Sequence, residues 1–88
     1  MSNIIMRYED YLIHTKHASD NTVASYMRDL RQYASYLGSE GIDVLDADQD
    51  VVSGYMNSMK ANGKSAATIS RALASIKSFY AFLAERGE

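Results

Sequence analysis

Apolar residues recur along this 88-residue chain at the three- and four-residue spacing of a helix, not at the two-residue alternation of a strand. In residues 23–37, for example, they stand at positions i, i+4, i+7, i+11 and i+14. Glycines or polar capping residues mark the ends of most such stretches. The pattern predicts an all-α domain of four helices, at about residues 3–17, 20–37, 47–61 and 65–86.

Each predicted helix has one apolar stripe, which we expect to face a shared core. The four stripes are Ile5, Tyr8, Tyr11 and Leu12; Val23, Met27, Leu30, Ala34 and Leu37; Val52, Tyr55, Met56 and Met59; and Ile69, Leu73, Ile76, Tyr80 and Leu83.

Residues 19–37 and 65–83 repeat one pattern at an offset of 46 residues. Each stretch opens with S-x-x-T followed by Val or Ile, and each closes on Leu. Because a serine at this position accepts a hydrogen bond from the first turn of a helix, Ser19 and Ser65 are predicted N-caps. Asp46 with Gln49 is a predicted capping box for the third helix.

A small and polar face lies opposite the apolar stripe of the fourth predicted helix. It contains Ala67, Arg71, Ala74, Ser75 and Ser78, with Thr68 at its edge and Lys64 just ahead of the helix. The second helix repeats this arrangement with Asn21, Ser25, Arg28 and Gln32, and with Thr22 at the edge. Small residues let a backbone approach a phosphate, and Arg, Asn and Gln can bind base edges. The same face could equally be an ordinary solvated surface with good caps.

The net charge argues against a nucleic-acid partner, but the distribution of charge along the chain weakens that argument. The formal net charge is -2, whereas nucleic-acid binding depends on neutralising phosphates. The acids concentrate in residues 40–50, however, and the stretch 60–77 has four basic residues and no acid. We therefore expect one acidic end and one basic end.

Other chemistry finds little support in the chain. There is no cysteine, no signal-peptide pattern and no apolar run long enough for a membrane span, so we expect a soluble, cytoplasmic protein without disulfides. His14 and His17 could form half a metal site, but no further ligand has suitable spacing. The calcium-loop pattern that begins at Asp46 fails at Val51, where glycine is required. No nucleophile motif accompanies the histidines, so we expect no enzyme activity, cofactor, metal or small-molecule substrate.

Two strings resemble the tyrosine recombinase family, in particular the N-terminal core-binding domain of phage integrases and Xer-type recombinases. They are S-A-A-T-I-S-R-A-L-A-S-I-K-S-F-Y-A-F-L in the fourth helix and S-D-N-T-V-A-S-Y-M-R-D-L-R-Q-Y-A-S-Y-L in the second. The resemblance extends over about residues 5–85.

The resemblance implies a four-helix, SAM-like orthogonal bundle that forms half of a clamp around double-stranded DNA. It implies a single domain over residues 1–88, and a catalytic domain, absent from this chain, that would follow a linker beginning near Gly87. That domain and neighbouring recombinase subunits are the expected protein partners, and cleavage and rejoining of DNA would belong to the parent protein. The DNA-facing candidates by this resemblance are Thr22, Ser25, Arg28, Lys64, Ser65, Thr68, Arg71, Ser75 and Lys77.

The alternative function is a helical protein-protein interaction module without DNA binding. Tyr36 and Phe82 motivate it, because both are predicted to project away from the apolar stripes of their own helices.

Overall fold

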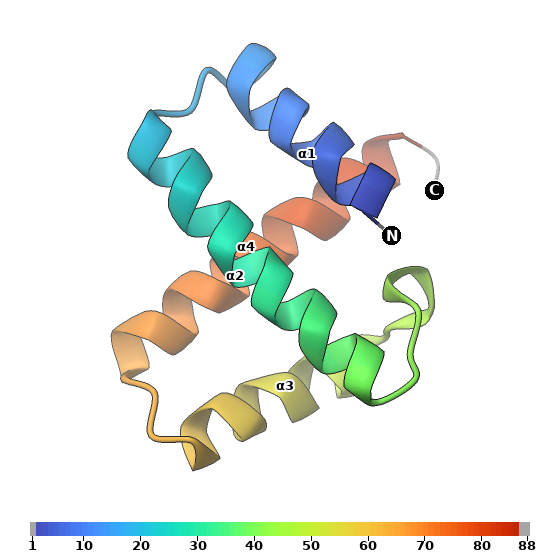
Figure 1. Cartoon of the computed structure of the whole chain (residues 1–88), viewed down its shortest axis with the longest axis vertical. Coiled ribbons are helices and arrows are strands. Elements are labelled where there is room, and N and C mark those ends of the chain that lie inside the picture. The colour runs from blue at the N-terminus through green and yellow to red at the C-terminus, as the bar shows by residue number, and fades with distance from the viewer. Residues whose placement is uncertain (1, 87–88) are drawn as a thin grey trace.

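Two antiparallel helix pairs pack crosswise on each other (Figure 1). A computed structural model describes residues 2–86, and its helices are α1 (Ser2–His14), α2 (Asp20–Ser39), the short 3-10 helix η1 (Val44–Asp46), α3 (Gln49–Ala61) and α4 (Ala66–Glu85). The most extensive contact joins α2 to α4, while α1 packs on α2 and α3 packs on α4. No strand occurs in residues 2–86. The prediction of a single all-α domain with four helices is confirmed.

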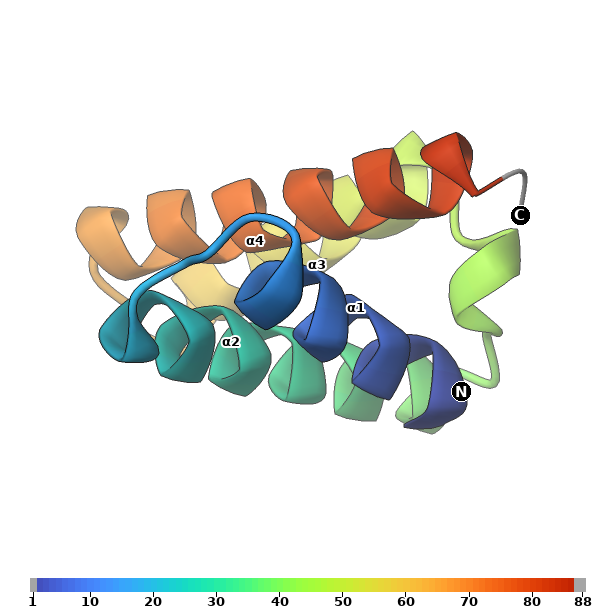
Figure 2. The same ribbon diagram turned by 90° about the horizontal axis from the view of Figure 1, so that it is seen from above.

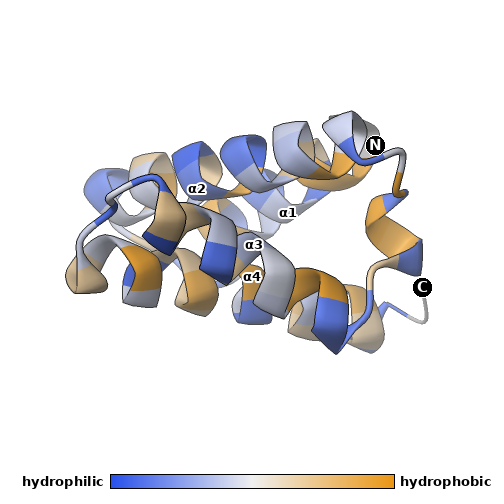
Figure 3. Cartoon of the chain, turned by 90° about the horizontal axis from the view of Figure 1, so that it is seen from below, coloured by the Kyte–Doolittle hydropathy of each residue, from blue (hydrophilic) through white to orange (hydrophobic). Residues whose placement is uncertain are grey.

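Figure 2 shows α2 and α4 in separate layers, with the core between them. The predicted stripe of α1 is largely confirmed, since Tyr8 and Leu12 are buried and Ile5 and Tyr11 pack against the core. In α3, Tyr55 and Met59 are buried. Hydropathy differs between the two crossing helices: blue segments are frequent along α2, whereas tan and orange prevail along α4 (Figure 3).

Helix α4 is buried on two sides, which the single predicted stripe did not anticipate. Its buried positions are Ala72, Ser75, Ile76, Phe79, Phe82 and Leu83. Leu73, Ile76 and Tyr80 of the predicted stripe line a groove of about 440 Å³ against α3. The rings of Phe79 and Phe82 instead contact Tyr8 of α1. A helix between two neighbours needs two apolar faces, so Ser75 and Ser78, predicted to face outward, turn toward other helices.

The start of α3 also differs from the prediction. Its N-cap is Asp48, whose carboxylate accepts a hydrogen bond from the Val51 amide at 3.0 Å. Asp46, the predicted cap, instead ends η1. The short helix η1 and the helix α3 thus follow each other, and each has its own aspartate cap. In η1 the Asp43 carboxylate accepts a hydrogen bond from the Leu45 amide. Of the aspartates in the rejected calcium pattern, Asp48 thus acts as a backbone cap.

Helix α1 ends three residues before the predicted boundary at His17. The backbone of His17 adopts a positive φ of 52°, in the left-handed region. The amide of Ala18 returns to the carbonyl of Leu12 at 2.9 Å, which closes the helix end. Glycine is the usual residue at such a position, because a side chain there is strained.

We therefore expect His17→Gly to raise the free energy of unfolding by about 1 kcal/mol, the cost of placing a Cβ in the left-handed region. Urea unfolding followed by circular dichroism measures this change. Lys16→Gly is the matched control and should not stabilise the domain, since Lys16 is not among the residues with positive φ. A lower unfolding midpoint for His17→Gly would show that its imidazole makes a stabilising contact.

The two ends of the bundle differ in charge. Helices α2 and α4 both begin at the same side of the molecule, on the left of Figures 1 and 2. The segment that joins α2 to α3 lies on the opposite side. That segment and the first turn of α3 contain five exposed acids, Glu40, Asp43, Asp46, Asp48 and Asp50. The expected separation of an acidic end from the rest of the molecule is thus present.

None of the helices within residues 2–86 is long and apolar enough to cross a membrane. Gly87, near which the family resemblance implies the start of a linker, lies outside the described residues.

Candidate nucleic-acid interface

The two S-x-x-T turns form nearly identical caps at the same side of the bundle. Ser19 accepts a hydrogen bond from the amide of Thr22 at 3.2 Å and donates one to the Thr22 hydroxyl at 2.9 Å. Ser65 and Thr68 repeat both bonds, at 3.1 and 2.9 Å. The predicted pair of capped helix starts is confirmed. The first amides of each helix have no acceptor within the helix, so both tips are slightly positive.

Most of the candidate side chains around these tips are accessible. Thr22 and Arg28 on α2 are exposed, as are Lys64, Ser65 and Lys77 around α4. Ser25, Thr68 and Arg71 are half-buried. Lys77 also lines the groove between α4 and α3, so it lies on the flank of α4 and not beside α2. The role of these residues in DNA binding stays a prediction.

Ser75 was predicted to face DNA, but its side chain is fully buried between α2 and α4. Its hydroxyl lies 3.1 Å from a carboxylate oxygen of Asp29 and 3.0 Å from the backbone carbonyl of Arg71. A solvent-facing role required Ser75 to lie opposite the apolar stripe, but the crossing of the two helices covers it. In this conformation Ser75 can contact no external partner.

Asp29 is the polar residue that sequence reasoning missed. It is only 3% exposed, and its two carboxylate oxygens accept hydrogen bonds from Nε and Nη2 of Arg71, each at 3.0 Å. These bonds, together with the negative charge of Asp29, raise the pKa of Arg71 above its ordinary value. Within the described residues, every buried side-chain nitrogen or oxygen has a hydrogen-bond partner.

A signal for Asp29 did exist in the repeat. At the offset of 46 residues, Asp29 is the counterpart of Ser75, and these two counterparts touch. Equivalent positions of two like helices meet where the helices cross if an approximate two-fold axis relates them. Polar residues at such a pair of positions indicate a buried contact, not two solvated ones.

Tyr36 and Phe82, which motivated the alternative function as a protein-protein interaction module, are not exposed as predicted. Phe82 is 2% exposed, and Tyr36 is half-buried with its ring 5.0 Å from the ring of Tyr55. Their distance from the predicted stripes reflects the second buried face of α4 and the contact of the Tyr36 ring with Tyr55 of α3. Neither residue offers a free aromatic surface for a partner.

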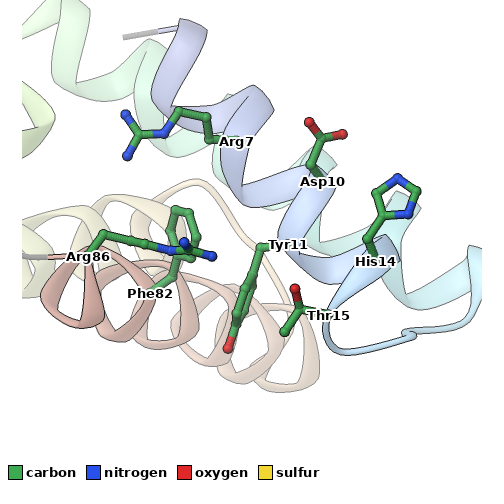
Figure 4. A pocket seen from close by; sticks show the side chains of 7 residues that line it. All are labelled: Arg7, Asp10, Tyr11, His14, Thr15, Phe82 and Arg86. Atoms are coloured by element: carbon green, nitrogen blue, oxygen red, sulfur yellow. The ribbon is translucent and has the colours of Figure 1, made fainter.

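A second concave region, of about 340 Å³, lies between α1 and the end of α4 (Figure 4). The guanidinium of Arg86 lies over the rings of Phe82 and Tyr11, at 5.2 and 5.9 Å from their centroids. Because this region is at the C-terminal end of α4, it is separate from the capped tips. In residues 2–86 no group of three or more acidic, histidine or cysteine side chains could hold a metal ion, and His14 and His17 are exposed.

Comparison with known proteins agrees with the all-α, four-helix fold. A family model described as "Phage integrase, N-terminal SAM-like domain" matches residues 5–87. A protein of Caldanaerobacter subterraneus named as a tyrosine recombinase is 40% identical over 92% of this chain and 28% of its own length. Tyrosine recombinase XerD of Listeria monocytogenes is 32% identical over 100% of this chain and 30% of its own. XerD of Oceanobacillus iheyensis is 43% identical over 74% and 23%.

The chain thus spans less than a third of the length of these relatives. No solved structure matches it at a significant level.

Proposed function

The chain belongs to the family of phage integrase N-terminal SAM-like domains, and from that premise we propose that it holds duplex DNA for a site-specific tyrosine recombinase. Its relatives are named as tyrosine recombinases. In this proposal the domain is one half of a clamp, and the catalytic domain of a longer parent chain is the other half. Neighbouring recombinase subunits would be further partners. DNA cleavage and rejoining would belong to the parent, in integration or recombination.

The observation that supports DNA binding most directly is the pair of matching caps at one side of the bundle. Backbone amides at a helix start suit a phosphate, and both starts here combine such amides with hydroxyl groups. Lys64, directly before Ser65, adds positive charge at one tip, and Arg28 adds an exposed charge nine residues beyond Ser19 on α2. Five acids gather at the opposite side, away from the tips, whereas Asp20 is an exposed acid at the start of α2.

A salt titration of duplex binding tests the proposal. If Arg28, Lys64, Arg71 and Lys77 each neutralise one phosphate, the slope of log affinity against log salt should be about -3.6. In parallel, amide chemical shifts on adding duplex should change in α2 and α4 and stay constant in residues 40–50. Affinity that is independent of salt, or shifts confined to residues outside α2 and α4, would contradict the proposal.

A single substitution gives a sharper test. Lys64→Ala should lower the affinity for duplex DNA about two- to fivefold at low salt and should reduce the magnitude of the salt slope by about 0.9. Arg86→Ala is the matched control, since it removes the same charge at the other end of α4. The control should leave the slope unchanged. Equal effects of the two substitutions would indicate binding through overall charge and not through the tips.

This domain alone should not cleave DNA. The tyrosines Tyr8, Tyr33, Tyr55 and Tyr80 have raised pKa values, mainly through burial, which disfavours the ionised form that a nucleophile needs. Because the nucleophile is proposed to belong to the catalytic domain of the parent chain, incubation with labelled duplex should yield no covalent adduct. An adduct trapped on any tyrosine of this chain would overturn the assignment of cleavage to another part of the parent protein.

A further inference from the structure

Arg71 is held in one orientation while part of its side chain faces solvent. The buried carboxylate of Asp29 accepts two parallel hydrogen bonds from Nε and Nη2, and the Arg71 side chain is nevertheless 40% exposed. Two of the five N–H donors of an arginine are thereby used, which leaves three. The three remaining donors belong to Nη1 and Nη2, the outer edge of the guanidinium.

That outer edge is the part of an arginine able to bind two acceptors at once. An arginine on a helix surface would normally lose considerable rotamer entropy on fixing such a contact. Here the contact with Asp29 fixes the side chain before any partner arrives, and the Ser75 hydroxyl supports the same carboxylate. The guanidinium is preorganised, so less free energy is lost on binding.

We propose that Asp29 is a positioning residue, which aims the outer edge of Arg71 at a pair of hydrogen-bond acceptors on duplex DNA. The proposal rests on the DNA-binding function proposed above and adds a residue that does not itself touch DNA. The acceptors are oxygen or nitrogen atoms of a phosphate or of a guanine edge, which share this chemistry.

The sign of one substitution separates positioning from simple electrostatics. An acid near a polyanion repels it, so removing the charge of Asp29 should strengthen DNA binding if charge alone matters. Positioning requires the opposite, because Asp29→Asn removes one of the two acceptors that hold Arg71. We expect Asp29→Asn to weaken duplex binding about fivefold, the order of coupling seen between contacting residues.

Matched variants complete the experiment, with binding measured by fluorescence anisotropy on a labelled duplex. Asp46→Asn makes the same chemical change at an exposed acid on the opposite side of the bundle and should leave affinity unchanged. In the Arg71→Ala background, Asp29→Asn should cause no further loss. Circular dichroism and amide spectra report whether each variant retains the fold.

Arg71→Lys keeps the charge and can still pair with Asp29, but it lacks the outer pair of donors. It should bind more weakly than the wild type at equal charge, which keeps the proposal testable even if Asp29→Asn unfolds. Wild-type affinity in Arg71→Lys, or unchanged or tighter binding by folded Asp29→Asn, overturns the positioning role. If the wild-type domain shows no salt-dependent binding of duplex DNA, the proposed function fails instead.

The salt slope identifies the acceptor. A slope reduced by about 0.9 in Arg71→Ala assigns the contact to a phosphate. An unchanged slope with lost preference between duplexes that differ at one guanine assigns it to a base edge.

Discussion

Replacing Phe82 with alanine should lower the free energy of unfolding by about 3–5 kcal/mol, the usual cost of deleting a buried aromatic ring. The Phe82 ring lies 4.8 Å from the ring of Tyr11 and 5.4 Å from that of Tyr8, centroid to centroid. These contacts join α1 to the last turns of α4. Since a domain of this size has a total stability of about 5–10 kcal/mol, this loss would remove a large share of it.

Urea unfolding followed by circular dichroism measures this loss. Met6→Ala is the control, because Met6 lies on α1 but is 61% exposed, and its replacement should change stability by no more than about 0.5 kcal/mol. A loss below about 1 kcal/mol for Phe82→Ala would mean that Phe82 lies on the surface, as its position outside the predicted apolar stripe indicated.

Alkaline pH should destabilise the domain steeply through its buried tyrosines. Burial raises the pKa values of Tyr8, Tyr33, Tyr55 and Tyr80 above the ordinary value of 10.0. Tyr80 is held further in its neutral form because its hydroxyl donates a hydrogen bond to the carbonyl of Val44 at 2.8 Å. The Tyr33 hydroxyl lies 2.8 Å from the same oxygen. Because the Tyr80 hydroxyl donates its hydrogen bond to Val44, the Tyr33 hydroxyl is the donor in the bond between the two tyrosines.

The sign follows from proton binding. Above pH 10 the unfolded chain releases these protons while the folded domain retains them, so stability is complete below pH 10 and declines as pH rises toward the folded pKa values. Each such tyrosine contributes a slope of about 1.4 kcal/mol per pH unit. Urea unfolding at a series of pH values between 7 and about 11.5 should show a plateau and then a fall.

Tyr80→Phe provides the control for this prediction. It should be less stable than the wild type at neutral pH by about 1 kcal/mol, because it lacks the hydroxyl that binds Val44. Above pH 10 its decline should be shallower by the share of one tyrosine. Parallel declines in the two proteins would show that Tyr80 does not contribute to the alkaline transition.

The sequence predicts the local features of this fold well, because local chemistry causes them. The S-x-x-T turns at Ser19 and Ser65 form the expected caps, since capping joins residues only three positions apart. The helix count and the core positions of α1 follow from spacing alone. Near η1 the prediction was wrong, because Asp46 and Asp48 both suit a helix start and only the packing of Val44 in the core decides between them.

Features that depend on which helices meet were less predictable. A helical wheel for α4 assumes one buried face, so it placed Ser75 and Phe82 outside. The ion pair between Asp29 and Arg71 joins residues 42 positions apart, and nothing in the local pattern of either helix requires it. The capped tips of the candidate interface could therefore be predicted from the sequence. The orientation of Arg71 could be known only from the way in which α2 and α4 cross.

The contact between Asp29 and Ser75 has a geometric consequence for the two tips. Asp29 lies ten residues beyond Ser19, and Ser75 lies ten residues beyond Ser65. At 1.5 Å per residue, each arm from pivot to tip measures about 15 Å. The N-terminal halves of α2 and α4 therefore extend by equal lengths from one polar crossing point to their capped tips. Any change in the crossing angle of the two helices alters the distance between the tips without bending either helix.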